Sequence, residues 1–244
     1  MDIQQALQEI RSFCETNANP VLVQKYAKYF VEGYDAYGID GKLTEVQRKQ
    51  WYADWSMEHD LDWFLNLGDR LVKTGKYEEG WIAMSFIILQ VKSLSPDTLI
   101  RLGTWLEEGG LRNWAHIDTF SGELLSQFLV RKIVPLSAFA EWRASPSKWK
   151  RRAVPVTLIK ALKLDYKTGE LLSFIDPLMG DSEKVVHQGL GWFLREAWKR
   201  DRVPVEAFLL KWKDTCARLI IQYATEKMSK EEKLTYRRSK LRNL

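Results

Sequence analysis

The sequence has 244 residues, of which 45% are apolar and 28% are charged. This composition excludes a disordered chain and predicts a globular protein, long enough for one large domain or a short array of helical repeats. No apolar run approaches the ~20 residues that a membrane span needs, and the amphipathic N-terminus lacks the apolar core of a signal peptide. We therefore expect a soluble, cytoplasmic protein with no membrane partner.

Charge is unevenly distributed along the chain. The net charge is +5, but residues 1–120 carry 12 Lys/Arg and 18 Asp/Glu, whereas residues 121–244 carry 25 and 14, an excess of 11 positive charges. This asymmetry predicts a polyanionic partner for the second half. A basic surface that serves no partner is the alternative.

Cysteine and histidine are sparse. The two cysteines, Cys14 and Cys216, lie far apart in the sequence, which favours buried free thiols in a reducing compartment over a disulfide. The three histidines are isolated from one another, and no Cys/His cluster has the spacing of a zinc site. We expect neither a metal nor a cofactor.

The predicted elements are helices from end to end. Apolar residues recur at intervals of three and four, as in residues 3–10, and no stretch alternates in the manner of a strand. The segment 95–97 (Ser-Pro-Asp) supplies an N-cap, a proline at the first helical position and an acid in the first turn, so a helix should begin there. The β-branched segment 154–159 should be a helix distorted by Pro155. Breaks between helices are predicted at Asn19-Pro20, Gly38 to Gly41, Gly75, Ser95-Pro96, Gly109-Gly110, Ser145-Pro146 and Gly180-Asp181.

From about residue 78, helical stretches recur in pairs every 35 to 45 residues. A period of this length is typical of HEAT-like helix pairs that stack into a solenoid with an extended concave surface. The sequence thus predicts an all-α superhelix over residues 1–228, with at least ten helices and a basic concave face. Residues 229–244 are expected to form a basic C-terminal helix or arm. The predicted pairs cover residues 78–108, 112–145, 148–180 and 184–226.

One candidate site combines an aromatic ring with a carboxylate. Trp114 and Asp118 are four residues apart, so they share one face if this segment is helical. A carboxylate beside an aromatic ring would stabilise a positive charge that develops on a sugar. A core tryptophan beside a surface acid is the competing interpretation, because this spacing is common.

A second candidate is a run of basic residues. The stretch 143–163 contains seven basic residues and no acid, and four of the seven lie within residues 148–152. Cations at this density should not all pair within the chain, so phosphate contact is one interpretation and a solvated charged face is the other. The candidate DNA-binding residues are Lys148, Trp149, Lys150, Arg151 and Arg152.

A third candidate surrounds two glycines. Gly189 and Gly191 lie within a predicted helix, where each glycine costs about 1 kcal/mol relative to alanine. We therefore expect them to serve close packing or the close approach of a ligand. Trp192 and Arg195 follow them, and an arginine near an aromatic ring suits contact with nucleic acid.

These three segments, in this order, resemble the AlkD family of DNA alkylation-repair glycosylases. The matching motifs are Trp-x-x-x-Asp at Trp114 and Asp118, Trp-x-x-Arg-Ala at Arg152, and Gly-Trp-x-Leu-Arg-Glu at Trp192; Tyr26 is a further match near the N-terminus. The resemblance spans most of residues 19–226. It implies HEAT-like repeats around DNA and the excision of cationic bases such as N3-alkyladenine and N7-alkylguanine.

The resemblance also implies a role for each matched residue. Asp118 stabilises the oxocarbenium-like sugar, Trp114 and Trp192 hold the deoxyribose between their faces, and Arg152 binds the phosphate beside the lesion. It further implies that the base need not be flipped into a pocket. The departures are the segment 38–48, which lacks the family's proline, and a His-Gln pair at 187–188 where a basic residue is usual.

Three functions remain open from the sequence. The first is a monomeric DNA glycosylase that acts on double-stranded DNA carrying alkylated bases. The second is a HEAT-like protein that recognises damaged or distorted DNA without cleaving the glycosidic bond, and the third is a protein-interaction solenoid with an acidic partner. Asp118 favours the first over the second, because a pure DNA binder gains nothing from an acid that faces phosphate.

Overall fold

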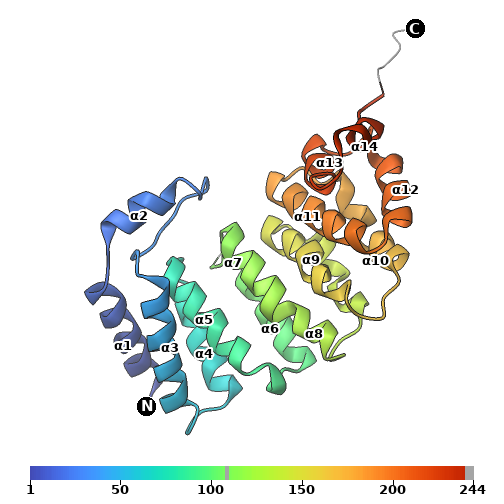
Figure 1. Cartoon of the computed structure of the whole chain (residues 1–244). Helices are drawn as coiled ribbons and strands as arrows, with labels where there is room; N and C mark the ends of the chain where they lie inside the picture. Colours follow the sequence, from blue (N-terminus) through green and yellow to red (C-terminus); the bar gives the residue numbers. More distant parts are fainter. Residues whose placement is uncertain (108–109, 240–244) are drawn as a thin grey trace. The chain divides into compact units, whose positions relative to one another are not determined.

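The computed structural model describes residues 1–107 and 110–239 of the chain (Figure 1). Over these residues the protein has fourteen α-helices and no β-strand. The predicted all-α fold is therefore confirmed, as is the prediction of at least ten helices, and the succession of helices is consistent with a helical repeat. Gly109 of the predicted break at 109–110 and residues 240–244 of the predicted C-terminal arm lie outside the described residues.

The chain divides into two compact units, Met1–Phe128 and Leu129–Leu244. The predicted boundary at residue 228 stays a prediction. Helices of the first unit are α1 (Ile3–Thr16), α2 (Pro20–Ala27), α3 (Gly41–Trp55), α4 (Leu61–Val72), α5 (Tyr77–Leu89), α6 (Pro96–Glu107) and α7 (Trp114–Thr119). A π-helical turn, η2 (Phe120–Leu125), continues α7 into α8 (Ser126–Val130). Those of the second unit are α9 (Lys148–Ala161), α10 (Thr168–Ile175), α11 (Lys184–Arg200), α12 (Arg202–Trp212), α13 (Arg218–Ala224) and α14 (Lys230–Thr235).

Two of the four predicted pairs coincide with two helices, namely α5 with α6 and α9 with α10. Residues 112–145 instead contain α7, η2 and α8, followed by the 3-10 turns η3 (Leu136–Phe139) and η4 (Glu141–Ala144). Pro135 and Pro146 flank these turns, and proline removes an N–H donor and pushes the preceding residue out of the α region. Residues 184–226 contain three helices, α11 to α13.

Local chemistry sets the helix ends. As predicted, α6 begins at Pro96, and the Ser95 hydroxyl accepts a hydrogen bond from the backbone N–H of Thr98 at 3.3 Å. The β-branched segment 154–159 is helical, and Pro155 lies inside α9. In the C-terminal segment, α14 begins with a capping box between Ser229 and Glu232.

The core of the first unit lies between α4 and α5, where Phe64 and Phe86 are fully buried. By contrast, α2 buries none of its residues. In the second unit α11 packs against both α9 and α13 (Figure 1). Of the eleven tryptophans, five are buried, five are half-buried, and Trp114 is the one exposed side chain, with 42% of its surface accessible. Trp114 is thus the tryptophan most available to a ligand.

Both cysteines are buried free thiols, as predicted. Burial raises the pKa of Cys14 to about 12, with a further contribution from the carboxylates of Glu78 and Glu79. None of the described helices combines the length and the apolar character that crossing a membrane requires.

Candidate nucleic-acid interface

The first candidate group lies on α7. Trp114 is the first residue of this helix and Asp118 lies one turn later, where its side chain is half-buried. Asn113 caps the helix, because its side-chain oxygen accepts a hydrogen bond from the backbone N–H of His116 at 2.9 Å. The predicted helical spacing of Trp114 and Asp118 is therefore present, and both belong to the first unit.

A buried histidine anchors α7 on α5. His116 is 1% exposed, and its ring stacks on Tyr77 with centroids 4.6 Å apart. Its Nε2 lies 2.8 Å from the backbone oxygen of Tyr77 and its Nδ1 lies 3.0 Å from the side-chain nitrogen of Asn113. Nε2 therefore donates while Nδ1 accepts, as in the neutral ring. Gly80 leaves the space that this ring fills, because a Cβ there would lie 2.8 Å from a ring carbon.

This histidine predicts a pH-dependent stability. Burial lowers the pKa of His116 to about 4 from its usual 6.5, despite the opposing hydrogen bond to Tyr77. The unfolded chain therefore binds the extra proton first, so stability is retained above pH 6.5 and is lost as the pH falls toward 4. The expected loss is about 3 kcal/mol. Denaturant unfolding between pH 7 and 4 measures it.

The matched variant is His116→Gln, which keeps an amide donor and acceptor but does not titrate. Its free energy of unfolding should fall less than that of the wild type over the same range. Parallel pH profiles for the two proteins would contradict the assignment of this titration to His116.

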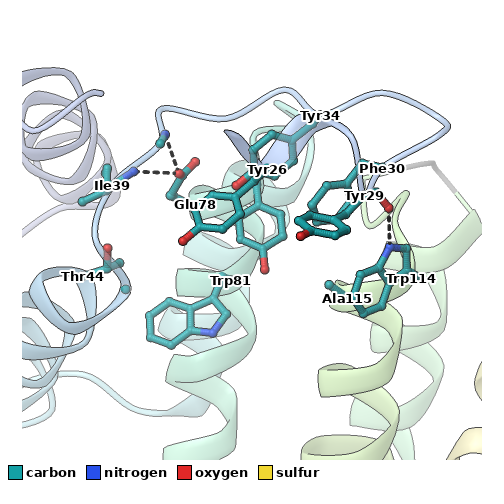
Figure 2. A pocket seen from close by; sticks show the side chains of 13 residues that line it. Tyr26, Tyr29, Phe30, Tyr34, Ile39, Thr44, Glu78, Trp81, Trp114 and Ala115 are labelled. Atoms are coloured by element: carbon teal, nitrogen blue, oxygen red, sulfur yellow. Dashed lines mark hydrogen bonds between the residues drawn. The ribbon is translucent and has the colours of Figure 1, made fainter. Parts of the chain in front are cut away.

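The exposed Trp114 contacts the segment that follows α2. Its indole Nε1 donates a hydrogen bond to the backbone oxygen of Tyr29 at 3.0 Å, drawn as a dashed line in Figure 2. Its ring is nearly parallel to that of Phe30, with centroids 5.7 Å apart and planes inclined by 17°. Phe30 in turn stacks on Tyr34 at 4.4 Å. The indole thus has a fixed orientation, although it remains substantially exposed.

These contacts border an aromatic pocket in the first unit, which we call the Trp81 pocket. It has a volume of about 570 Å³ and is lined by residues of α2, the following segment, α3, α5 and α7. Figure 2 shows the aromatic side chains of these segments gathered around one space. Among the described residues, the lining consists of Tyr26, Tyr29, Phe30, Tyr34, Gly38, Ile39, Gly41, Thr44, Tyr77, Glu78, Trp81, Trp114 and Ala115.

Glu78 fixes one wall of the Trp81 pocket. Its carboxylate is buried and accepts hydrogen bonds from the backbone N–H groups of Tyr37 at 2.9 Å, Gly38 at 2.8 Å and Ile39 at 3.2 Å. The bond from Ile39 is drawn in Figure 2. Three donors to one carboxylate hold the chain between α2 and α3 against the start of α5. Gly38 adopts a φ of +79°, and a Cβ there would collide with Val23, so this turn requires glycine.

The second candidate group lies at the start of α9 in the second unit. Arg152 is 4% exposed and donates a hydrogen bond from Nη1 to the backbone oxygen of Val185 at 2.5 Å. Trp149 is also buried, at 7% exposed, with the Lys148 ammonium 5.4 Å from its ring centroid. Lys150 lies over the ring of Trp142 at 4.9 Å. Lys148 and Lys150 are both half-buried.

Arg151 is held inside the second unit. Its guanidinium forms a salt bridge with Asp181 at 2.6 Å, and the two side chains are 15% and 5% exposed. It also donates to the backbone oxygens of Ser145 at 2.7 Å and Pro146 at 3.1 Å. This arrangement ties the turn before α9 to the turn before α11, and it commits Arg151 to internal contacts.

The third candidate group lies on α11. Gly191 serves close packing, because a Cβ there would overlap the Cβ of Tyr223 on α13. Gly189 faces α9, where a Cβ would lie 3.3 Å from a side-chain carbon of Arg152. Trp192 is half-buried, and Arg195 forms salt bridges with Glu196 and Glu226. The glycines thus have the packing role, one of the two that the sequence predicted.

The structure brings some predicted residues together. Tyr26 and Trp114 line the same pocket, although they are far apart in the sequence. The second unit contains Trp192, Arg195 and residues 148–152, which we call the basic cluster. Sequence reasoning missed the pocket residues Phe30, Tyr34, Tyr77 and Trp81; a visible but unused indication was the density of aromatic residues between positions 26 and 37. No group of three or more His, Cys, Asp or Glu in the described part of the chain is arranged to hold a metal ion.

A family model covers most of the chain, and a solved structure has a similar fold. A family model described as "DNA alkylation repair enzyme" matches residues 10–228. Among solved structures, a predicted DNA alkylation repair enzyme from Enterococcus faecalis is similar with a TM-score of 0.73 and 16% identity, over 88% of this chain and 98% of that one. At 16% identity, this similarity shows that the two proteins share a fold. A search of curated proteins gave no match.

Proposed function

Since this chain belongs to the DNA alkylation repair enzyme family, we propose that it is a DNA glycosylase that excises cationic alkylated purines from double-stranded DNA. The observation that carries this proposal is the pairing, on α7, of the exposed ring of Trp114 with the half-buried carboxylate of Asp118 one turn away. Family membership gives the chain a role in DNA repair with DNA as its partner. The lesion class and the reaction are part of the proposal.

The proposed reaction is a hydrolysis. The bond between C1′ and the purine nitrogen breaks, and its electron pair neutralises the cationic base. A water oxygen then bonds to C1′, and its proton passes to solvent water. N3-alkyladenine and N7-alkylguanine already carry the positive charge, so the enzyme needs no acid to protonate the leaving group. Asp118 stabilises the positive charge that develops on the sugar, and the face of Trp114 adds to this stabilisation.

Residues of the second unit have supporting roles in this proposal. The family resemblance assigns sugar contact to Trp192 and phosphate contact to Arg152. Because Arg152 is 4% exposed and its Nη1 donates to the backbone oxygen of Val185, the proposal gives phosphate contact to the lysines beside it. Lys148 and Lys150 add positive charge at the start of α9, within a half of the chain that carries an excess of 11 positive charges. Neutralising phosphates releases counterions from DNA, so these lysines contribute affinity without sequence preference.

The direct test is incubation with duplex DNA that contains N7-methylguanine, followed by detection of free 7-methylguanine. Release above the spontaneous rate supports the glycosylase. DNA binding without release would replace it with the second candidate, a non-catalytic protein that recognises damaged DNA. One observation favours that candidate: the Trp114 N–H donates to the backbone oxygen of Tyr29 and its ring stacks on Phe30, so residues of the chain itself already occupy both.

DNA affinity should depend on the two lysines of α9. Replacing Lys148 and Lys150 together by methionine should weaken duplex binding and reduce the slope of log affinity against log salt by about 1.8, since each phosphate contact contributes about 0.9. Fluorescence anisotropy over a salt series measures this slope. The control is Lys42→Met with Lys49→Met on α3, which removes the same charge from the acidic half. Equal losses in the two double variants would mean that net charge alone governs binding.

A further inference from the structure

A groove in the second unit has no part in the proposed glycosylase. It has a volume of about 530 Å³ and joins the turn after α8 to the segment after α9. We call it the Val130 groove, and every residue that lines it belongs to the second unit. The described lining consists of Leu129, Val130, Lys132, Ile133, Val134, Pro135, Leu164, Asp165 and Tyr166.

The Val130 groove combines buried apolar residues with apolar side chains that remain accessible. Leu129 and Val134 are 2% and 8% exposed, whereas Val130 is 40% exposed. Three further side chains of the lining are half-buried, namely Ile133, Leu164 and Tyr166. A cavity of this size and lining suits a ligand that brings apolar groups of its own.

Positive charges flank the Val130 groove on both sides. Arg131 and Lys132 lie in the turn after α8, and Lys163 and Lys167 stand at either end of the segment 164–166. All four side chains are exposed, and within the described part of the chain their charged groups form neither a hydrogen bond nor an ion pair. These four cations are therefore available to an acidic ligand.

The backbone at Lys132 points in the same direction. Its φ is +56°, a left-handed conformation that glycine or asparagine adopts more readily than lysine. A lysine at this position carries a conformational cost, and a ligand contact made by its ammonium accounts for that cost. The described lining contains a single acid, Asp165, so the rim keeps an excess of positive charge.

The Val130 groove and the lysines proposed to bind phosphate belong to opposite ends of α9. Lys148 is the first residue of this helix and Ala161 is the last, so about 20 Å separate the two ends. A phosphate would use the cations of the groove but gain nothing from its apolar lining. An acidic peptide with apolar side chains matches both features.

We propose that the Val130 groove binds an acidic peptide segment of a partner protein. The apolar side chains of this segment enter the groove, and its carboxylates meet the four flanking cations. The contact leaves the start of α9 free, so that the partner and DNA are bound at the same time. This inference goes beyond the proposed glycosylase and does not depend on it.

The test measures the binding of short fluorescein-labelled peptides to the full chain by fluorescence anisotropy. The probes form an array in which aspartates alternate with varied apolar residues. For the peptides that bind, changing the apolar residues to serine should reduce affinity at least about tenfold, because burial of each apolar side chain contributes a factor of that order. Affinity should also fall as salt screens the charges.

A charge placed in the groove should block the peptide. Val130→Glu should reduce peptide affinity at least about tenfold, because it sets a carboxylate in the apolar lining beside those of the peptide. The matched control is Ile100→Glu, the same change at an exposed apolar residue of α6 in the first unit. This control should bind the peptide as the wild type does.

Two pairs of lysines should separate the peptide site from the DNA site. Replacing Lys132 and Lys167 together by methionine should reduce peptide affinity about threefold or more, since exposed ion pairs each contribute modestly. Duplex DNA affinity should stay unchanged in this variant. The double replacement of Lys148 and Lys150 should have the reverse pattern.

Three results would overturn the inference: no binding by any peptide of the array, undiminished affinity of the serine peptides, or displacement of the peptide by duplex DNA. If Val130→Glu fails to fold, Tyr166→Ala takes its place, and wild-type peptide affinity in the folded variant also contradicts the proposal. Weaker duplex DNA binding after loss of Lys132 and Lys167 would instead assign the groove to the DNA-binding surface.

Discussion

Replacing Asp118 by asparagine should slow the release of N7-methylguanine from duplex DNA by a factor of ~10²–10³, because it removes one preorganised charge that acts on the transition state. The substitution is nearly isosteric and removes no positive charge, so the fold and most of the DNA affinity should persist. Single-turnover release of free base, with enzyme in excess, measures the effect on chemistry separately from binding and product release.

The control is Asp97→Asn in the first turn of α6. It makes the same charge change on an exposed side chain of the same unit, so it reports any general effect of charge on DNA binding. Trp114→Ala should slow release by a smaller factor than Asp118→Asn, because the ring positions the sugar rather than supplying the counter-charge. If Asp118→Asn released the base at the wild-type rate, this carboxylate would be a surface acid without a role in catalysis.

The nature of the lesion provides a second check on the same chemistry. The proposal supplies no acid to protonate a leaving group, so neutral lesions should be excised poorly by every variant. Efficient removal of a neutral base such as hypoxanthine would show that the leaving-group argument is wrong, even if Asp118 proved essential.

The helical fold was predictable from the sequence because its determinants are local. The start of α6 follows from three adjacent residues, and the shared face of Trp114 and Asp118 follows from their spacing alone. The Trp81 pocket was not predictable, because it joins residues from α2 to α7 that come together only through tertiary packing.

The basic cluster shows a different limit of prediction from sequence, which concerns ion pairs. The absence of acids between residues 143 and 163 suggested that its cations should not all find partners within the chain. For Arg151 that window was too narrow, because the partner Asp181 lies 30 residues further along the chain. Arg195 likewise pairs with Glu226, from beyond its own helix. A local count of charges therefore overstates the number of cations available to phosphate.

Because Arg151 pairs with Asp181 inside the protein, we expect its replacement to lower stability. Replacing Lys148 and Lys150 should instead weaken DNA binding. Arg151→Met should lower the free energy of unfolding by about 3 kcal/mol or more, because it leaves the buried carboxylate of Asp181 without its counter-charge. It also removes the donors to the backbone oxygens of Ser145 and Pro146. The DNA affinity of the folded variant and its salt slope should stay close to those of the wild type.

Urea unfolding without DNA measures the effect of Arg151→Met on stability. Unfolding with duplex DNA present shows whether the folded variant still binds DNA. The control is Lys163→Met, an exposed cation of the same basic stretch, whose loss should change stability by no more than about 0.5 kcal/mol. The double variant Arg151→Met with Asp181→Leu should recover part of the lost stability, because it removes the unpaired buried charge. If Arg151→Met were instead stable but bound DNA more weakly and with a flatter salt slope, Arg151 would bind phosphate, as the sequence predicted.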